Sequence, residues 1–116
     1  MSYSISLKCP TCTCPDHEHY SINLGGYTWN VSGMYSSAFP PLYAGGQRSL
    51  YTLNGMSGFE AGWILEHIVS EMCAYPEKYR AMNPPNGWGD YTGALMYIER
   101  ILRACRERPT WILEVE

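Results

Sequence analysis

The sequence predicts an α+β fold, in which a small, mainly antiparallel sheet packs against two main helices. Three observations lead to this prediction. Residues 3–8 and 20–24 alternate apolar and polar side chains, as half-buried strands do. Two longer segments, which begin near residues 57 and 90, carry apolar side chains at helical spacing. Residues 111–115 alternate again, and we expect this closing strand to pair with the N-terminal hairpin.

Length and composition limit the classes of protein to consider. The 116 residues suit a single domain, and the net charge of −3 without a basic run argues against binding to duplex nucleic acid. No apolar run approaches the roughly 20 residues of a membrane span. The first residues have neither a charged leader nor a long apolar region, so we expect no secretion signal and a reducing cytoplasm. In that compartment the 5 cysteines are more typical of thiols or metal ligands than of disulfides.

The first two predicted strands flank a segment, residues 9–19, that is rich in cysteine and histidine. Its candidate metal ligands are Cys9, Cys12, Cys14, His17 and His19. Zinc prefers four tetrahedral nitrogen or sulfur ligands, but zinc motifs usually bring a second ligand pair from another element. Three hypotheses therefore stay open: a structural zinc knuckle, a reduced solvent-facing loop, and a disulfide from Cys9 to Cys12 or Cys14.

The middle of the chain, residues 27–58, is rich in glycine and aromatic residues and poor in charge. Arg48 is its only charged residue. We expect the glycines at 25 and 26 to close the second strand, although residues 27–31 could continue it, and we expect a short strand at residues 50–53. The aromatic residues argue against disorder, and loops of this length are usually functional or contain short elements.

This region predicts a ligand site formed with Trp88. The candidate binding residues are Tyr27, Trp29, Asn30, Tyr35, Arg48 and Trp88. Aromatic rings can stack on a flat ligand such as a base, Asn30 can read its edge, and Arg48 or Arg80 can meet a phosphate. The alternative is that the aromatic residues pack on one another and brace the loops. Because no nucleophile elbow, phosphate loop or dinucleotide fingerprint is present, we expect a non-enzymatic protein.

Two helices are predicted from their caps and their apolar faces. Ser57 followed by Glu60 is typical of a capping box, and Asp90 is the expected cap of the last helix, which Pro109 ends. We expect a short helix over residues 77–82. The buried face predicted for the first helix comprises Phe59, Ile64, Leu65, Ile68, Val69, Met72 and Cys73, and Cys105 is expected to be buried in the last helix.

Residues 83–90, Asn-Pro-Pro-Asn-Gly-Trp-Gly-Asp, join the two helices. Two prolines and two glycines exclude a regular element here. We expect Trp88 to point toward either the core or the aromatic middle region, and the stretch to form one wall of a binding site rather than its chemical centre.

Two segments resemble a group of small proteins encoded by bacteriophages and their hosts. They are Tyr-Thr-Trp-Asn-Val-Ser-Gly-Met-Tyr at 27–35 and Asn-Pro-Pro-Asn-Gly-Trp-Gly-Asp-Tyr-Thr-Gly-Ala-Leu at 83–95, together with Cys-Pro-Thr-Cys at 9–12. The first segment resembles Tyr-Thr-His-Asn-hydrophobic-Ser-Pro-Met in that group, and it differs where Trp29 and Gly33 stand. The resemblance implies a phage origin but no specific activity.

A phage origin suggests one kind of binding protein by analogy of size and composition. Some small phage proteins act as sponges, which sequester a nucleotide signal of host antiphage defence, and they often place their pockets between subunits. The first hypothesis is therefore a sponge for a small nucleotide-type ligand, with a homo-oligomer as an expected state. The second is a zinc-knuckle domain that binds a host or phage protein.

Overall fold

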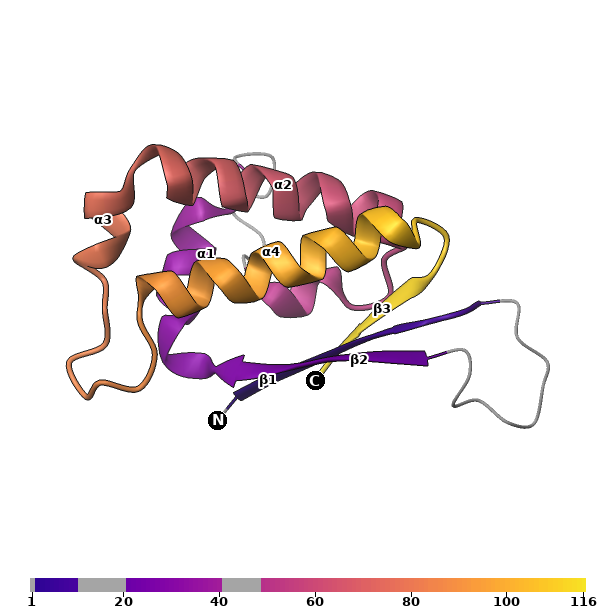
Figure 1. The fold of residues 1–116 in the computed structure, drawn as a ribbon, viewed down its shortest axis with the longest axis horizontal. Helices are drawn as coiled ribbons and strands as arrows, with labels where there is room; N and C mark the ends of the chain where they lie inside the picture. Colours follow the sequence, from indigo (N-terminus) through magenta and orange to yellow (C-terminus); the bar gives the residue numbers. More distant parts are fainter. Residues whose placement is uncertain (1, 11–20, 41–48) are drawn as a thin grey trace.

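The chain has the predicted α+β fold (Figure 1). The computed structural model describes residues 2–10, 21–40 and 49–116. An antiparallel three-stranded sheet has the strand order β2-β1-β3, so the closing strand pairs with the N-terminal hairpin as expected. The elements are β1 (Ser2–Lys8), β2 (Ser21–Thr28), α1 (Ser32–Ala38), α2 (Gly58–Ala74), α3 (Pro76–Arg80), α4 (Tyr91–Glu107) and β3 (Ile112–Val115), with 3₁₀ turns at Trp29–Val31 and Leu50–Leu53.

One face of the sheet forms the floor of the core. Tyr3, Ile5 and Leu7 alternate along the central strand β1 and are completely buried. Leu113 and Val115 continue this buried face on β3. The segment before α2 covers the outer edge of β3, because the Gly55 N–H donates to the Leu113 carbonyl at 2.8 Å. This edge strand is therefore not open to pairing with another chain.

The two glycines of β2 bend the strand and do not close it, which corrects the prediction. β2 continues to Thr28, and the register with β1 shifts between Ser4 and Ser6. Gly25 has φ +85°, and its N–H donates to the Asn23 side chain at 2.8 Å. A β-bulge with glycine in this conformation adds one residue to the strand without ending the pairing.

Two elements after β2 differ from the prediction. Helix α1 lies in the aromatic middle region, where the sequence shows no long apolar period, and it buries Met34, Tyr35 and Ala38. Leu50–Leu53 is a 3₁₀ turn and not a strand. Ser49 and Thr52 form a capping box around this turn, so local hydrogen bonds outweigh the strand preference of the residues.

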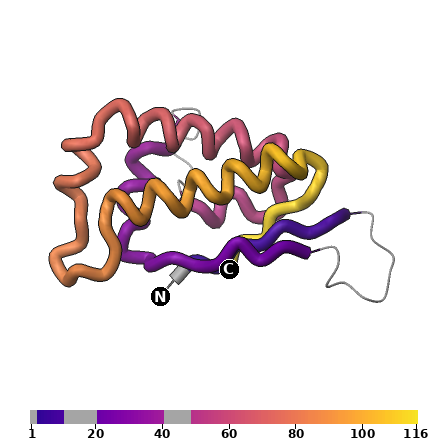
Figure 2. Tube along the Cα trace, in the orientation of Figure 1, coloured from indigo at the N-terminus to yellow at the C-terminus, as the bar shows by residue number. Residues whose placement is uncertain are grey.

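Helices α2 and α4 lie antiparallel over the sheet, and α3 turns the chain from one to the other (Figures 1 and 2). Both predicted caps are confirmed. The Ser57 hydroxyl accepts from the Glu60 N–H at 3.2 Å, and an Asp90 carboxylate oxygen accepts from the Gly93 N–H at 2.7 Å. The short helix α3 ends at Arg80, two residues before its predicted end.

Two residues that we expected on the buried face of α2 are exposed. Phe59 and Cys73 lie on the surface, whereas Cys105 of α4 is buried as expected. The buried face consists of Ala61, Ile64, Leu65, Ile68 and Met72. Successive helical residues are rotated by about 100°, so Phe59, two positions before Ala61, points nearly away from this face. The predicted apolar face was too wide.

Removing the cap of α4 tests this part of the fold. Asp90→Ala leaves the Gly93 N–H without its acceptor and should lower the free energy of unfolding by about 1 kcal/mol. Asp90→Asn is the matched control, because it keeps a side-chain oxygen and should retain most of the stability. Urea unfolding of the three proteins measures the difference. Equal losses in the two variants would contradict a capping role.

Candidate functional site

Two segments that lie far apart in the sequence, residues 27–35 and 83–95, pack directly against each other. The Tyr27 hydroxyl, at the end of β2, accepts a hydrogen bond from the Asp90 N–H at 3.2 Å. A Cβ atom at Gly93 would collide with the same hydroxyl, so the Tyr27 ring lies over the first turn of α4. Gly89 has φ +95°, and a Cβ there would collide with the Thr28 side chain. The end of β2 and the start of α4 thus form one end of the molecule.

The loop that carries Trp88 is braced by its own asparagines. The Asn83 side chain accepts from the Tyr91 N–H at 2.8 Å, and the Asn86 side chain accepts from the Trp88 N–H at 2.9 Å. Gly87 and Gly89 on either side both have positive φ. Trp88 itself is 69% exposed. Its indole therefore lies in solvent on a braced backbone and is not part of the core.

Two of the predicted binding residues, Tyr35 and Trp29, pack against the core at this end of the molecule. Tyr35 is completely buried, and its hydroxyl donates to the Ala94 carbonyl at 3.0 Å. Burial raises the pKa of Tyr35, so the hydroxyl stays protonated and remains a donor. Trp29 is half-buried, with its ring 5.0 Å from that of Tyr3 and 5.6 Å from that of Tyr51. This aromatic packing matches the alternative in which the rings brace the loops.

The Tyr27 ring also packs against a side chain of helix α4. It stacks on the ring of Tyr97 at 5.7 Å. The Tyr97 hydroxyl donates to the Gly25 carbonyl at 3.1 Å, and burial raises the pKa of Tyr97 to about 12. The bulge of β2 is thereby tied to α4, and the half-buried Tyr27 ring is fixed in place.

Four of the exposed residues at this end form what we call the end surface, which comprises Asn30, Gly33, Met82 and Trp88. Gly89 packs closely beside Thr28 and Val31 and so places Trp88 beside the turn that carries Asn30. Met82 and Gly33, the other two residues of the end surface, contact each other: a Cβ atom added at Gly33 would lie 3.7 Å from the Met82 Cε. Of the residues predicted to bind a ligand, Asn30 and Trp88 lie on this surface.

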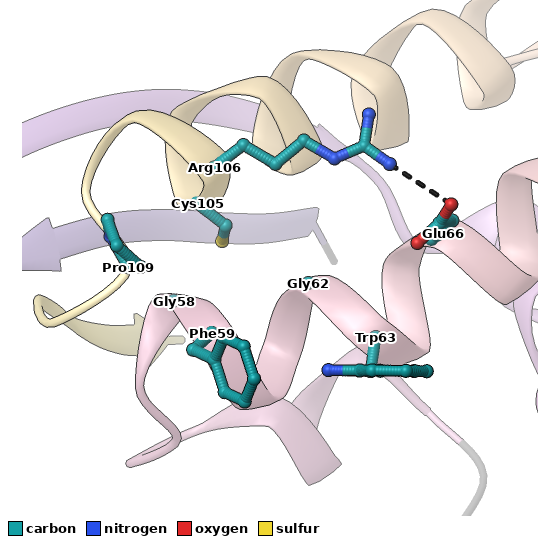
Figure 3. Close-up of a pocket in the computed structure, with 8 residues that line it drawn as sticks. All are labelled: Gly58, Phe59, Gly62, Trp63, Glu66, Cys105, Arg106 and Pro109. Atoms are coloured by element: carbon teal, nitrogen blue, oxygen red, sulfur yellow. Dashed lines mark ion pairs between the residues drawn. The ribbon is translucent and has the colours of Figure 1, made fainter.

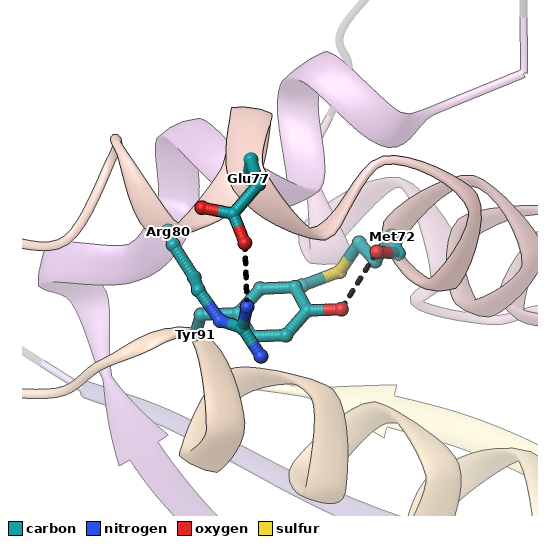
Figure 4. Close-up of polar contacts among 4 residues, drawn as sticks. All are labelled: Met72, Glu77, Arg80 and Tyr91. Atoms are coloured by element: carbon teal, nitrogen blue, oxygen red, sulfur yellow. Dashed lines mark hydrogen bonds and ion pairs between the residues drawn. The ribbon is translucent and has the colours of Figure 1, made fainter.

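A positive charge lies two residues before Met82. The Arg80 guanidinium is 5.3 Å from the centre of the Tyr91 ring and 2.8 Å from Glu77, and the Tyr91 hydroxyl donates to the Met72 carbonyl at 2.7 Å (Figure 4). The Arg80 side chain is about half exposed. Its ring contact holds the guanidinium, while its ion pair is open to solvent and to competition by another anion.

Several predicted residues lie outside the described ranges. They are Cys12, Cys14, His17, His19 and Arg48. Cys9 is described and directly follows β1, and Lys8 pairs with Ser21, so both ends of the cysteine-rich segment are held side by side. Within the described part of the chain, no three His, Cys, Asp or Glu side chains gather at one point.

The structure also shows a hollow that the sequence did not predict. It has a volume of about 310 Å³ and lies between the first half of α2 and the end of α4 (Figure 3). Phe59 and Trp63 form one wall and are 64% and 68% exposed, and the opposite rim carries an ion pair of Arg106 with Glu66 at 3.3 Å. The four-residue spacing of Phe59 and Trp63 could have indicated that both lie on one face of the helix, but the predicted core included Phe59.

Cys105 lies at the base of this hollow, where burial raises the pKa of its thiol to about 11 and keeps it protonated.

Comparison with known proteins finds no match to a protein-family model, a curated protein or a solved structure. In residues 2–10, 21–40 and 49–116, no helix is both long and apolar enough to cross a bilayer.

The contact between Tyr27 and Gly93 can be tested by a double-mutant cycle. Gly93→Ala should lower the free energy of unfolding by about 1–3 kcal/mol, because the new methyl group must displace the Tyr27 ring. In a Tyr27→Phe background the same change should cost less, with a coupling of at least about 0.5 kcal/mol.

Thr92→Ala, at the exposed neighbouring position, is the control, and its effect should be the same in both backgrounds. Urea unfolding supplies all the free energies. Additive effects of Gly93→Ala and Tyr27→Phe would show that the two segments are not joined by this contact.

Proposed function

We propose that the protein is a non-enzymatic binding protein that sequesters a small nucleotide-type ligand on the end surface. The observation that carries this proposal is the exposed indole of Trp88 on a braced loop. An indole in water is costly for a protein to keep, and a fixed backbone lowers the entropy lost when a ligand stacks on the ring. Such a residue is suited to bind a flat heterocycle.

The neighbouring groups suit the other parts of a nucleotide. Asn30 is exposed and offers an amide donor and a carbonyl acceptor to the edge of a base. Arg80 is the described cation closest to Met82 along the chain, and its guanidinium suits a phosphate. A bound phosphate would compete with Glu77 for Arg80, and this exchange is feasible because exposed ion pairs are weak.

The biological role follows from the resemblance to phage proteins. A phage protein that binds a nucleotide signal of host antiphage defence would act by sequestering it in the bacterial cytoplasm. This role needs tight binding and no chemical step, which agrees with a surface built from stacking and hydrogen-bonding groups.

Calorimetric titration against cyclic dinucleotides and ADP-ribose derivatives tests the proposal. At least one member of this panel should bind, and Trp88→Ala should weaken it about 5- to 150-fold, since base stacking is worth about 1–3 kcal/mol. The melting temperature of Trp88→Ala should be nearly unchanged, because the side chain is exposed.

Trp63→Ala is the matched control, since it removes an equally exposed indole from the opposite end of the helix pair and should leave ligand affinity unchanged. The proposal fails if no member of the panel binds. It also fails if Trp88→Ala and the unaltered protein bind with the same affinity.

The paired strands favour a second candidate function, an interaction domain organised by zinc. All five predicted ligands lie between Lys8 and Ser21, which pair across the sheet and bring both ends of the segment together. Cys9, Cys12, Cys14, His17 and His19 include the thiolates and imidazoles that structural zinc prefers. A knuckle at the tip of the hairpin would be free to bind a host protein and to inhibit or recruit it.

Metal analysis of protein purified under reducing conditions tests this candidate. We expect one zinc ion per chain and its loss in Cys12→Ser. Cys73→Ser, which alters an exposed cysteine of α2, should keep the metal. Substoichiometric zinc in the unaltered protein would contradict the knuckle.

A further inference from the structure

We propose that Asn86 is a modification site, whose side-chain amide converts to aspartate or isoaspartate in the folded protein. The chain contains two Asn-Gly sequences, Asn54-Gly55 and Asn86-Gly87. A glycine after an asparagine favours attack of its backbone nitrogen on the side-chain carbonyl, because a glycine has no Cβ atom to hinder the approach. Since the two dipeptides are identical, the fold decides which of them reacts.

The reaction is an intramolecular ring closure followed by hydrolysis. The Gly87 nitrogen bonds to the Asn86 Cγ, the bond from Cγ to the amide nitrogen breaks, and the proton of the Gly87 N–H leaves with that nitrogen as ammonia. Water then opens the cyclic imide. Attack of water at Cγ gives aspartate, and attack at the backbone carbonyl carbon gives isoaspartate, whose main chain runs through the former side chain. Water is the only co-reactant.

At Asn86 the structure leaves this ring closure open. Asn86 and Gly87 are both exposed. The Trp88 N–H donates to the Asn86 Oδ1 at 2.9 Å, and this hydrogen bond keeps the side-chain carbonyl beside the Gly87 peptide unit and polarises its Cγ. The Gly87 N–H donates to the Pro84 carbonyl at 3.3 Å, which is a long hydrogen bond. Both hydrogen bonds stay within the loop, so breaking them disturbs no helix or strand.

At Asn54 the same groups are bound to the sheet. The Gly55 N–H donates to the Leu113 carbonyl at 2.8 Å, and the Asn54 Oδ1 accepts from the Val115 N–H at 3.0 Å. Ring closure here requires the segment to leave the outer edge of β3. Gly55 and Gly87 are alike in other respects, because both have positive φ, +86° and +74°, and neither has an atom within 4 Å of an added Cβ. Hydrogen bonds across the fold therefore distinguish the protected asparagine from the reactive one.

The modification changes the surroundings of Trp88. Aspartate adds a negative charge two residues before the indole. Isoaspartate adds the same charge and lengthens the main chain by a methylene group, so the hydrogen bond from the Trp88 N–H cannot keep its present geometry. Either product would oppose a phosphate-bearing ligand at the end surface, a consequence that rests on the proposed function.

Peptide mapping of the folded protein, aged in mildly alkaline buffer, tests the proposal. Trypsin leaves Asn54 in the peptide of residues 49–78 and Asn86 in the peptide of residues 81–100. The peptide 81–100 should gain the mass of an amide-to-acid conversion and should contain isoaspartate. The peptide 49–78 should convert at least about tenfold more slowly, because Asn54 reacts only after local opening of the sheet edge.

Two controls isolate the effect of the fold. In guanidinium chloride, where the chain is unfolded, both peptides should convert at similar rates. Asn86→Gln should leave the peptide 81–100 unmodified, because the longer side chain must close a larger ring. Asn83, in the same peptide, precedes Pro84, which has no N–H to attack the side chain.

The consequence for binding is measured separately by titration of Asn86→Asp. A nucleotide that binds the unaltered protein should bind this variant about 2- to 5-fold more weakly, as expected for one exposed charge. Equal affinities would show that the modification does not affect the end surface.

Two results of the peptide mapping would overturn the modification site. One is a peptide 81–100 that converts in the unfolded chain but not in the folded protein, which would show that the loop protects Asn86. The other is equal conversion of both peptides in the folded protein, which would show that the fold does not select the site. Because the mapping involves no nucleotide, its outcome is independent of whether any member of the ligand panel binds.

Discussion

The structure depends on the contact between the Tyr27 hydroxyl and the first turn of α4. Gly93 leaves the space that the ring occupies, and the Asp90 N–H donates to the hydroxyl. A side chain at position 93 would collide with the ring of Tyr27 in its present place, so one of the two would have to shift. This contact joins the end of the N-terminal hairpin to the start of the last helix, and it determines where the loop with Trp88 and the turn with Asn30 lie. Two further hydrogen bonds connect the same elements: the Tyr97 hydroxyl donates to the Gly25 carbonyl of β2, and the Tyr35 hydroxyl donates to the Ala94 carbonyl of α4.

The fold was largely predictable from the sequence, because its main elements are specified locally. Alternation predicted the three strands, and Ser57 and Asp90 marked the starts of the two long helices, which the structure confirms. At two places local patterns failed because a nonlocal contact decides the outcome. The bulge at Gly25 is stabilised by Tyr97, and α1 is formed by a short segment whose buried residues contact a core built from distant elements. Phe59 was wrongly assigned to the buried face of α2, because a phenylalanine favours burial whereas its position on the helix faces solvent.

The candidate site was predictable only in part, for a related reason. The sequence identified an aromatic region and Trp88, but it could not separate rings that brace from rings that face solvent. Tyr35 is buried and Trp88 is exposed, although both are large aromatics in glycine-rich surroundings. The difference comes from tertiary packing: Tyr35 lies under α4, whereas Trp88 is lifted away from the core by a loop with two positive-φ glycines. The exposed pair of Phe59 and Trp63 was missed because Phe59 was assigned to the core, although the two aromatics lie four residues apart on one helix.

We propose that the exposed indole of Trp88 binds the nucleotide-type ligand, and the equally exposed indole of Trp63 serves as an internal control. The 4 tryptophans give separate indole N–H signals, so nitrogen-edited NMR can follow each one during titration with cyclic dinucleotides and ADP-ribose derivatives. At constant protein concentration we expect a binding ligand to shift the Trp88 signal most, with smaller changes at Trp29 and none at Trp63 or Trp111. A ligand that shifts Trp63 and leaves Trp88 unchanged, or a panel that moves no indole signal, would contradict the assignment of the end surface as the binding site.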